Sequence, residues 1–248
     1  MRSRLFRDSI KQQPANSRLI LWTGSDDCFM TERPFSETAG RSIQLFNGVN
    51  LNGWRQAGPG RFRIEDGMLV TEGGMGLLWY SARQFGNFEL QVDWRVTKKS
   101  DNSGIFVRFP APTVPNEAGG DPQVAINHGY EIQIDDEGAP GGAMIHKTGA
   151  IYSVQPPEKI ASKQPGEWNT FRIRVEGQIY NVTLNGEPVV PHFKGNRSMR
   201  GHIGLQNHSP EDQVFFSATS LPRRSELECV NATPDPTPCD WTPLARRR

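Results

Sequence analysis

The sequence predicts an all-β protein, folded as an antiparallel two-sheet sandwich of the jelly-roll type. Short segments in which apolar and polar residues alternate recur along the chain, as expected of strands with one buried face. Turn-forming pairs such as Asp66-Gly67 and Asn185-Gly186 separate several of them, and the 248 residues include 25 glycines and 19 prolines. No convincing helix extends over more than about ten residues. These observations favour roughly a dozen short strands joined by turns.

The clearest strand is Phe88–Val96, in which apolar side chains alternate with charged and amide side chains. The Asp66-Gly67 and Asn185-Gly186 pairs predict tight hairpin turns, because both positions of such a turn need a positive φ. In Ser103–Phe109 both faces carry an apolar group, so the pattern does not say which face is buried. The expected strands, in chain order, are 43–46, 61–65, 68–71, 76–80, 88–96, 103–109, 129–136, 171–175, 179–184, 201–208 and 214–221.

The chain divides into three parts by composition. Residues 1–40 are polar and without sustained periodicity, and we expect them to be an extension that is loosely ordered or draped on the domain. The jelly-roll domain is expected over 41–222, and a Pro-rich tail with a basic end follows over 223–248. Within the domain, two long loops rich in glycine and proline, 110–128 and 137–147, frame the strand 129–136, as the walls of a binding cleft would.

Charge and cysteine content limit the partners and the compartment. A net charge of +1 gives no indication of a nucleic acid or a membrane surface as partner. No apolar run has the length of a membrane span, and residues 19–22 are too short for a signal-peptide core, so a cytoplasmic location is slightly favoured. Cys28, Cys229 and Cys239 lack metal-binding spacing. Cys229 and Cys239 either form a local disulfide or remain free thiols.

The strand 129–136 carries the polar pattern with the most chemical meaning. Its alternation places three apolar residues on one face, namely Tyr130, Ile132 and Ile134. The opposite face carries two carboxylates and an amide, namely Glu131, Gln133 and Asp135. Such a row suits acid–base chemistry or cation binding, and the alternative is an ordinary solvated sheet face.

A series of short motifs in a fixed order resembles the 3-keto-disaccharide hydrolase family, over roughly residues 43–221. The motifs are Leu45-Phe46-Asn47-Gly48 with Leu51-Asn52-Gly53-Trp54, Asn102 to Phe106, Gly129 to Asp135, Thr148 to Tyr152, Glu167-Trp168-Asn169, Leu184-Asn185-Gly186 and Gly201 to His208. The resemblance implies a concanavalin A-like fold and a carbohydrate substrate. It also implies an enzyme that hydrolyses glycosides already oxidised at C3, or eliminates and rehydrates them.

That chemistry needs a base, a group that stabilises an oxyanion and an acid for the leaving group. Glu131 is the candidate base, because it lies mid-strand between the two long loops. Arg108 is the candidate oxyanion stabiliser, and its alternative role is an ion pair with Glu89 or Asp93. His208 is the candidate acid, base or ligand, with His202 and His128 as further possibilities. A divalent metal ion is an alternative oxyanion stabiliser, with Asp135 as its candidate ligand.

Other polar and aromatic residues are candidates for binding the sugar. They are Gln133 on the Glu131 face, Tyr152 and Phe106 as aromatic platforms, and His146 in the Gly-rich loop. Trp54, Trp94 and Trp168 are expected to pack in the core or at its corners. The glycines at 138–142 do not form a phosphate cradle, because no following helix or Lys-Ser ending accompanies them.

Two other functions remain open from the sequence. A non-catalytic carbohydrate-binding module could use the same fold. A glycosidase with two carboxylates, acting on unoxidised sugar, needs a partner for Glu131, and Asp135 lies ~13 Å away along the strand. Glu89 or Asp93 would then have to face Glu131.

Overall fold

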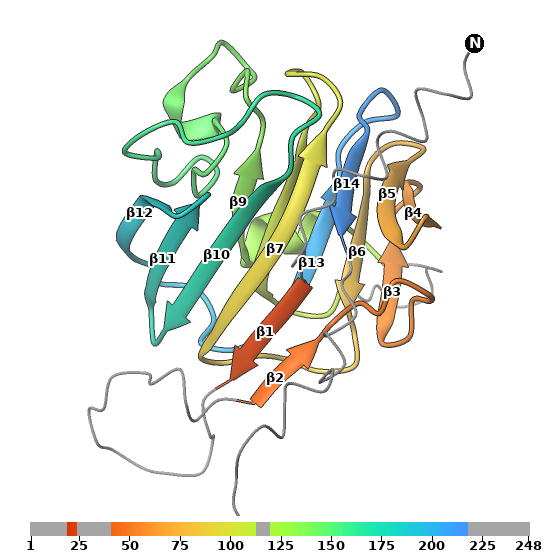
Figure 1. The fold of residues 1–248 in the computed structure, drawn as a ribbon. Coiled ribbons are helices and arrows are strands. Elements are labelled where there is room, and N and C mark those ends of the chain that lie inside the picture. The colour runs from red at the N-terminus through yellow and green to blue at the C-terminus, as the bar shows by residue number, and fades with distance from the viewer. Residues whose placement is uncertain (1–18, 24–40, 113–119, 218–248) are drawn as a thin grey trace, which may run out of the picture.

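Two antiparallel sheets stack face to face, and the nine-stranded one lies in front in Figure 1. A computed structural model describes residues 19–23, 41–112 and 120–217. Seven strands of the front sheet follow the order β12-β11-β10-β7-β14-β5-β4, and β1 pairs with both β7 and β2. Their bounds are β1 Leu19–Thr23, β2 Arg41–Gln44, β4 Arg61–Glu65, β5 Met68–Glu72, β7 Phe88–Val96, β10 Asn169–Glu176, β11 Ile179–Leu184, β12 Glu187–Lys194 and β14 Val214–Ser217.

The second sheet has five strands in the order β3-β6-β13-β8-β9. Their bounds are β3 Trp54–Ala57, β6 Gly76–Tyr80, β8 Ser103–Phe109, β9 Tyr130–Ile134 and β13 His202–Asn207. The predicted all-β, antiparallel two-sheet jelly-roll sandwich is therefore confirmed. A short helix, α2 (Gln123–His128), and a 3₁₀ turn, η2 (Met144–His146), complete the described elements.

The main hydrophobic core fills the space between the sheets. From β9 it contains Tyr130, Ile132 and Ile134, as the alternation predicts. From β8 it contains Ile105 and Val107, so these two residues mark the face of the strand that packs between the sheets, which the sequence pattern did not specify. Trp54 and Trp94 are buried in the same cluster, so their predicted packing role is confirmed.

Both predicted hairpin turns are confirmed. Asp66 and Gly67 have φ angles of 49° and 77°, and they join β4 to β5 with Glu65 opposite Met68. Asn185 and Gly186 have φ angles of 54° and 88°, between β11 and β12. Positive φ at both central residues matches the twist of the flanking strands, which is why Asp-Gly and Asn-Gly are favoured there.

Three details differ from the sequence-based expectation or lie beyond it. The predicted extension 1–40 contributes a strand, β1, whose Leu19 and Leu21 are buried in the main core. The predicted loop 110–128 contains α2. The tail 223–248 and all three cysteines lie outside the described residues.

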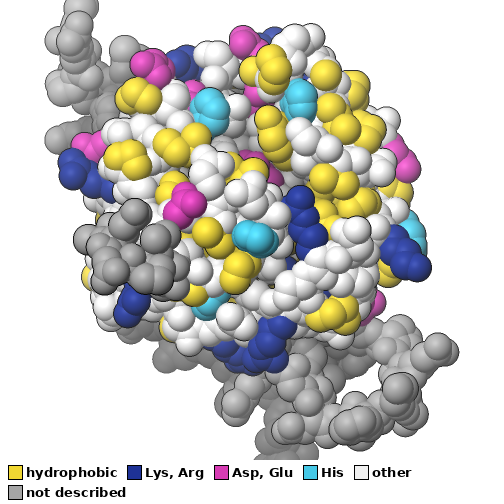
Figure 2. Space-filling view, turned by 180° about the vertical axis from the view of Figure 1, so that it is seen from behind, with side chains coloured by type: hydrophobic (Ala, Val, Ile, Leu, Met, Phe, Trp, Pro, Cys, Tyr) yellow, Lys and Arg dark blue, Asp and Glu magenta, His cyan; other side chains and the backbone are white. Residues whose placement is uncertain are grey.

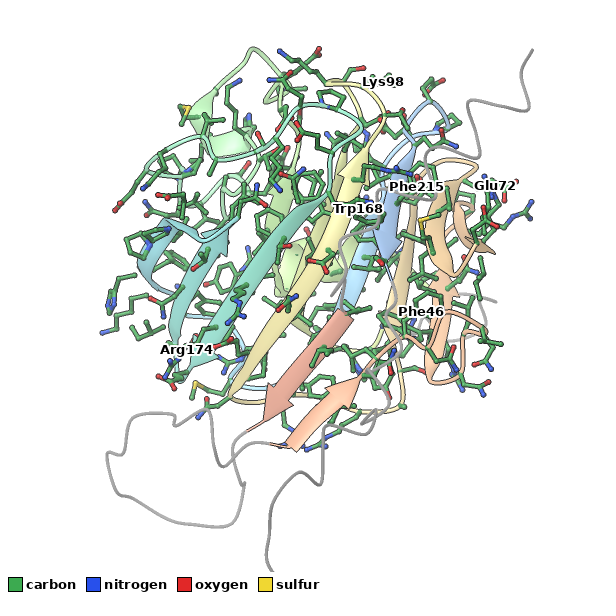
Figure 3. All side chains as sticks on the ribbon, in the orientation of Figure 1. Phe46, Glu72, Lys98, Trp168, Arg174 and Phe215 are labelled. Atoms are coloured by element: carbon green, nitrogen blue, oxygen red, sulfur yellow. The ribbon has the colours of Figure 1, made fainter. Side chains whose placement is uncertain are left out.

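The outer face of the nine-stranded sheet carries a separate apolar cluster of Met68, Val70, Trp168 and Phe215. Trp168 and Phe215 are labelled close together in Figure 3, and the Arg95 guanidinium lies 5.1 and 4.8 Å from their ring centroids. Trp168 thus packs on the surface of the sheet rather than between the sheets. Among the described helices, none is long and apolar enough to cross a membrane.

Candidate functional site

The outer face of the five-stranded sheet carries a cavity of about 370 Å³. Figure 2 views the molecule from this side and shows the face hollowed. The sheet supplies Glu131 and Gln133 from its edge strand β9, and Gln206 from β13, which lies on the other side of β8. The remaining lining residues come from loops and from α2, and they are Met75, Asn102, Ile126, Ala139, Pro140, Tyr152 and His208.

Glu131 is a buried carboxyl group with an unusual environment. Its residue is 6% exposed, and its Oε1 has no hydrogen-bond partner among the described residues. The side chain lies over Gly104 of the neighbouring strand, where an added Cβ would be 2.2 Å from Oε1. Burial without a compensating charge raises the pKa of Glu131 to about 8. A carboxyl group of this kind is a strong base when ionised and an acid when protonated.

Two amide oxygens in the same cavity share this lack of partners. Gln133 Oε1 and Gln206 Oε1 are both buried and without a hydrogen bond in the described structure. Buried polar atoms are almost always paired with protein or with water, so three acceptors without a protein partner in one cavity can receive donors from a bound molecule. A ligand rich in hydroxyl groups meets this demand.

His208 reaches the cavity from the end of β13, and it is held by Asp212. Its Nδ1 lies 3.0 Å from Asp212 Oδ2, and the Asp212 side chain is almost fully buried. The hydrogen bond to Asp212 raises the pKa of His208, against an opposing effect of burial. With Nδ1 engaged by the carboxylate, Nε2 is the nitrogen left for a ligand.

Tyr152 enters the cavity beside Glu131 because its segment runs along the edge of β9. The Tyr152 N–H donates to the Glu131 carbonyl at 2.9 Å, which fixes the two residues next to each other. His146 does not line the cavity, but its ring lies 5.0 Å from that of Tyr152 and tilts by 35°. His146 Nε2 also lies 3.1 Å from Ser153 Oγ. The structure therefore places His146 behind Tyr152, as its support.

Asp135 organises the loop that forms one wall of the cavity. Its Oδ1 accepts hydrogen bonds from the N–H groups of Glu137 and Gly138, at 2.9 and 2.8 Å. Its Oδ2 accepts from the Ala139 N–H at 2.8 Å and from Asn102 Nδ2 at 3.3 Å. Four donors occupy the lone pairs of this carboxylate.

These contacts do not fit the metal-ligand role considered for Asp135. A metal there would have to displace backbone N–H groups that shape the loop. Among the described residues, no three His, Cys, Asp or Glu side chains gather as a metal site would require. The described residues around Asp135 therefore do not fit a divalent metal ion.

Replacing Asp135 by alanine is expected to destabilise the fold and loosen the cavity wall. Three backbone N–H groups would lose their acceptor, and each lost bond to a charged group costs about 1.5–3 kcal/mol, partly recovered by water. Urea unfolding should show a loss of about 2–4 kcal/mol. Glu137→Gln, on the same loop with an exposed side chain, is the control that should change little. Unchanged stability of Asp135→Ala would contradict this role.

Arg108 is not in the cavity, which corrects its expected role as oxyanion stabiliser. Its φ is 58°, and the pairing of β8 with β13 shifts between His202 and Ile203, so Arg108 is the extra residue of a β-bulge. The bulge turns its side chain away from the cavity face. The guanidinium donates instead to the carbonyls of Gly86 and Gly177.

The alternative predicted for Arg108, an ion pair with Glu89 or Asp93, is not found either. Glu89 pairs with Arg172 at 3.3 Å on the other sheet. Asp93 accepts a hydrogen bond from the Thr170 hydroxyl. Arg108 is fully buried, and its positive charge is solvated by main-chain oxygens.

Phe106 and His202 also lie outside the cavity. Phe106 shares the outer face of the sheet with Glu131, but it packs against Phe109 and Ala125 beneath α2. It is 2% exposed and cannot act as a platform for a sugar. His202 is buried against Trp79, with Nδ1 2.9 Å from the Tyr80 carbonyl, and burial lowers its pKa.

The structure adds residues that the sequence did not single out as site residues. Asn102 links Gln133 to Asp135, accepting from Gln133 Nε2 at 3.4 Å. Gln206 alternates outward with His208 along one strand, a signal that was visible in the sequence. Asp212 follows His208 by four residues, and this short spacing in the sequence could have predicted that the two side chains pair.

Comparisons with known proteins agree with the resemblance seen in the sequence. Residues 41–219 match a family described as a 3-keto-alpha-glucoside-1,2-lyase-like domain. A 3-keto-disaccharide hydrolase of Bacteroides thetaiotaomicron is 30% identical over 222 residues, which covers 70% of this chain and 75% of the relative.

Two solved structures of similar fold, both from Parabacteroides distasonis, are described as glycosyl hydrolase candidates. One has a TM-score of 0.59 at 22% identity and covers 70% of this chain and 89% of its own. Another has a TM-score of 0.55 at 25% identity, with 68% and 92% covered. The expected concanavalin A-like class of sandwich is confirmed.

Proposed function

Because this chain belongs to the 3-keto-disaccharide hydrolase family, we propose that it cleaves glycosides whose sugar carries a ketone at C3, by elimination followed by hydration. The observation that carries the proposal is the buried, unpaired carboxyl group of Glu131 in a cavity with unpaired acceptors. A ketone at C3 acidifies the hydrogen on C2, so one strong base suffices to begin the reaction.

In the elimination, the ionised Glu131 removes the proton from C2, and the electrons move toward the C3 oxygen. The C1–O bond then breaks, which forms a C1=C2 double bond and restores the ketone. Protonated His208 supplies a proton to the departing oxygen from Nε2, while Asp212 holds its Nδ1. Protons are conserved in the elimination, because Glu131 gains one proton and His208 loses one.

The oxyanion formed at C3 requires hydrogen-bond donors, because no lysine or arginine of the described chain is placed to stabilise it. No Lys or Arg is among the lining residues that the structure describes. Tyr152 and the amides of Asn102 and Gln206 line the cavity and carry donors of this kind. In a site shielded from water, such donors are worth more than in solution.

Hydration completes the net hydrolysis. Water adds to C1 of the unsaturated ketone after losing a proton to neutral His208, and Glu131 returns its proton to C2. Both groups regain their starting states, and the products are the free 3-keto sugar and the released alcohol. The same pair of residues thus serves both half-reactions in reverse roles.

A glycosidase with two carboxylates is less well supported. Glu131 is the single carboxylate among the described lining residues, whereas that mechanism needs a second one across the scissile bond. Neither Glu89 nor Asp93 meets this need, because both lie on the nine-stranded sheet.

The test is turnover of a 3-keto-glucoside beside its unoxidised parent, with and without a chelator. We expect cleavage of the keto form alone, because only the ketone acidifies C2. Cleavage that survives the chelator supports a reaction run by protein groups, and loss that metal restores would require a bound metal ion.

Other outcomes would contradict the proposal. Comparable cleavage of the unoxidised parent would favour a conventional glycosidase. Binding of both sugars without cleavage of either would favour a non-catalytic carbohydrate-binding module.

A further inference from the structure

A second and smaller cavity, of about 160 Å³, lies beside the loop that Asp135 organises. Three lysines line it, namely Lys99 from the turn after β7, Lys147 from the segment after η2, and Lys163 from the loop before β10. The other lining residues are Asp136, Thr148, Ile160, Ser162, Gln164 and Pro165. None of them lines the cavity of Glu131. We propose that this second cavity binds one small oxyanion group, such as a phosphate, sulfate or carboxylate.

Two of the three ammonium groups are already held in place. Lys147 Nζ donates to the carbonyls of Asp136 and Glu137 at 3.0 and 3.3 Å. Lys163 Nζ donates to the Trp168 carbonyl at 2.9 Å. An ammonium has three N–H donors, so Lys147 keeps one and Lys163 keeps two. Cations fixed before the ligand arrives lose less side-chain entropy on binding.

The charge of the cavity favours an anion. Three lysines and one aspartate leave an excess of two positive charges. The Asp136 carboxylate is partly engaged, because its Oδ1 accepts from the Thr148 hydroxyl at 2.7 Å. Glu167 binds the Gln164 N–H at 3.2 Å, but it is exposed and outside the lining. Ser162 and Gln164 add uncharged donors to the three ammonium groups.

The size of the cavity limits the ligand. A water molecule occupies about 30 Å³ in the liquid, so the cavity has room for on the order of five waters. Cavities for drug-sized ligands begin near ~300 Å³. The fit is therefore to a single oxyanion or to one acidic group of a larger carbohydrate, and not to a whole sugar ring with its substituents.

A chain of hydrogen bonds connects this second cavity to the cavity of Glu131. Lys147 bonds the Glu137 carbonyl, and the Glu137 N–H bonds Asp135 Oδ1. Asp135 also bonds Ala139, which lines the cavity of Glu131. Three successive hydrogen bonds therefore link Lys147, where the anion would bind, to the wall of the Glu131 cavity. The proposal concerns binding alone and does not depend on the proposed function.

Calorimetric titration of the full chain with inorganic phosphate at fixed ionic strength tests the proposal. We expect saturable binding with a Kd of about 1 mM or tighter. Lys99→Gln and Lys163→Gln should each weaken it by roughly tenfold, the effect of losing one charged hydrogen bond. Lys159→Gln is the matched control, because Lys159 pairs with Glu187 and does not line the cavity.

Glucose 6-phosphate, titrated in parallel, distinguishes the two sources of the anion. Equal affinity for it and for inorganic phosphate would identify a site for free anions, and tighter binding would identify a site for an acidic sugar. Lys99 is exposed and makes no described hydrogen bond, so its variant tests binding without a risk to folding. The proposal fails if neither compound saturates, or if both lysine variants bind as the Lys159 control does.

Discussion

Glu131→Gln is expected to lower kcat for a 3-keto-glucoside by about 10²–10⁴-fold, the usual contribution of a positioned general base. Glutamine keeps the shape of the side chain over Gly104, but it cannot accept a proton. Glu89→Gln makes the same chemical change on the other sheet, where Glu89 pairs with Arg172, and it should retain activity. A Glu131→Gln enzyme with more than half of the wild-type kcat would exclude Glu131 as the base.

The pH dependence of kcat/KM should carry the signature of the same residue. With a pKa of about 8, Glu131 is ionised in roughly one molecule in ten at pH 7. The rate should therefore rise with pH in a range well above that of an ordinary carboxyl group, and it should fall again at higher pH as His208 loses its proton. A rising limb centred between pH 4 and 5 would instead indicate a solvated carboxylate.

The same substitution should increase stability. Glu131 has a pKa raised from 4.5 to about 8 in the folded state, so the unfolded chain ionises first as pH rises. Wild-type stability is fully present below pH 4.5 and falls progressively up to about pH 8, by at most about 5 kcal/mol. Glutamine does not ionise, so Glu131→Gln should be the more stable protein at pH 8 and above. Urea unfolding at pH 4 and pH 9 measures the difference, which should be much larger at pH 9.

Arg108→Met is expected to destabilise the fold by about 3–5 kcal/mol, because buried carbonyls lose hydrogen bonds to a charged donor that are worth about 1.5–3 kcal/mol each. The carbonyls of Gly86 and Gly177 would lose their donor in the protein interior. For a domain of this size, the melting temperature should fall by roughly 10 °C. Arg172→Met is the control, because Arg172 is exposed and its ion pair with Glu89 contributes little.

This variant also separates the two roles considered for Arg108. If the arginine only supports the fold, the kcat of folded Arg108→Met protein should stay close to the wild-type value at low temperature. A large loss of kcat with unchanged stability would restore Arg108 as a participant in the reaction.

The fold was predictable because its signals are local. Asp66-Gly67 and Asn185-Gly186 need no tertiary context to specify a hairpin, and the alternation in Phe88–Val96 specifies a strand with one buried face. The strand β1 was missed because its five residues are embedded in a polar segment, and its burial depends on pairing with β7. A strand this short has no periodicity of its own to read.

The sequence pattern in the strands predicted the cavity lining where strict alternation held. It placed Glu131 and Gln133 on one face, and both line the cavity. Arg108 was misplaced because a bulge inserts one residue into β8, which reverses every later side chain. Phe106 kept its face but is covered by α2, a helix of six residues that the Pro/Gly-rich composition concealed. Errors of this type come from contacts between distant segments, which no local pattern reports.

The space that Glu131 occupies exists because residue 104 has no side chain. One methyl group at this position would overlap the carboxyl oxygen, and the main chain of β8 cannot retreat without breaking its pairing with β9 and β13. Gly104→Ala is therefore expected to displace the Glu131 carboxyl group from its present position and to lower activity, while the sandwich remains folded.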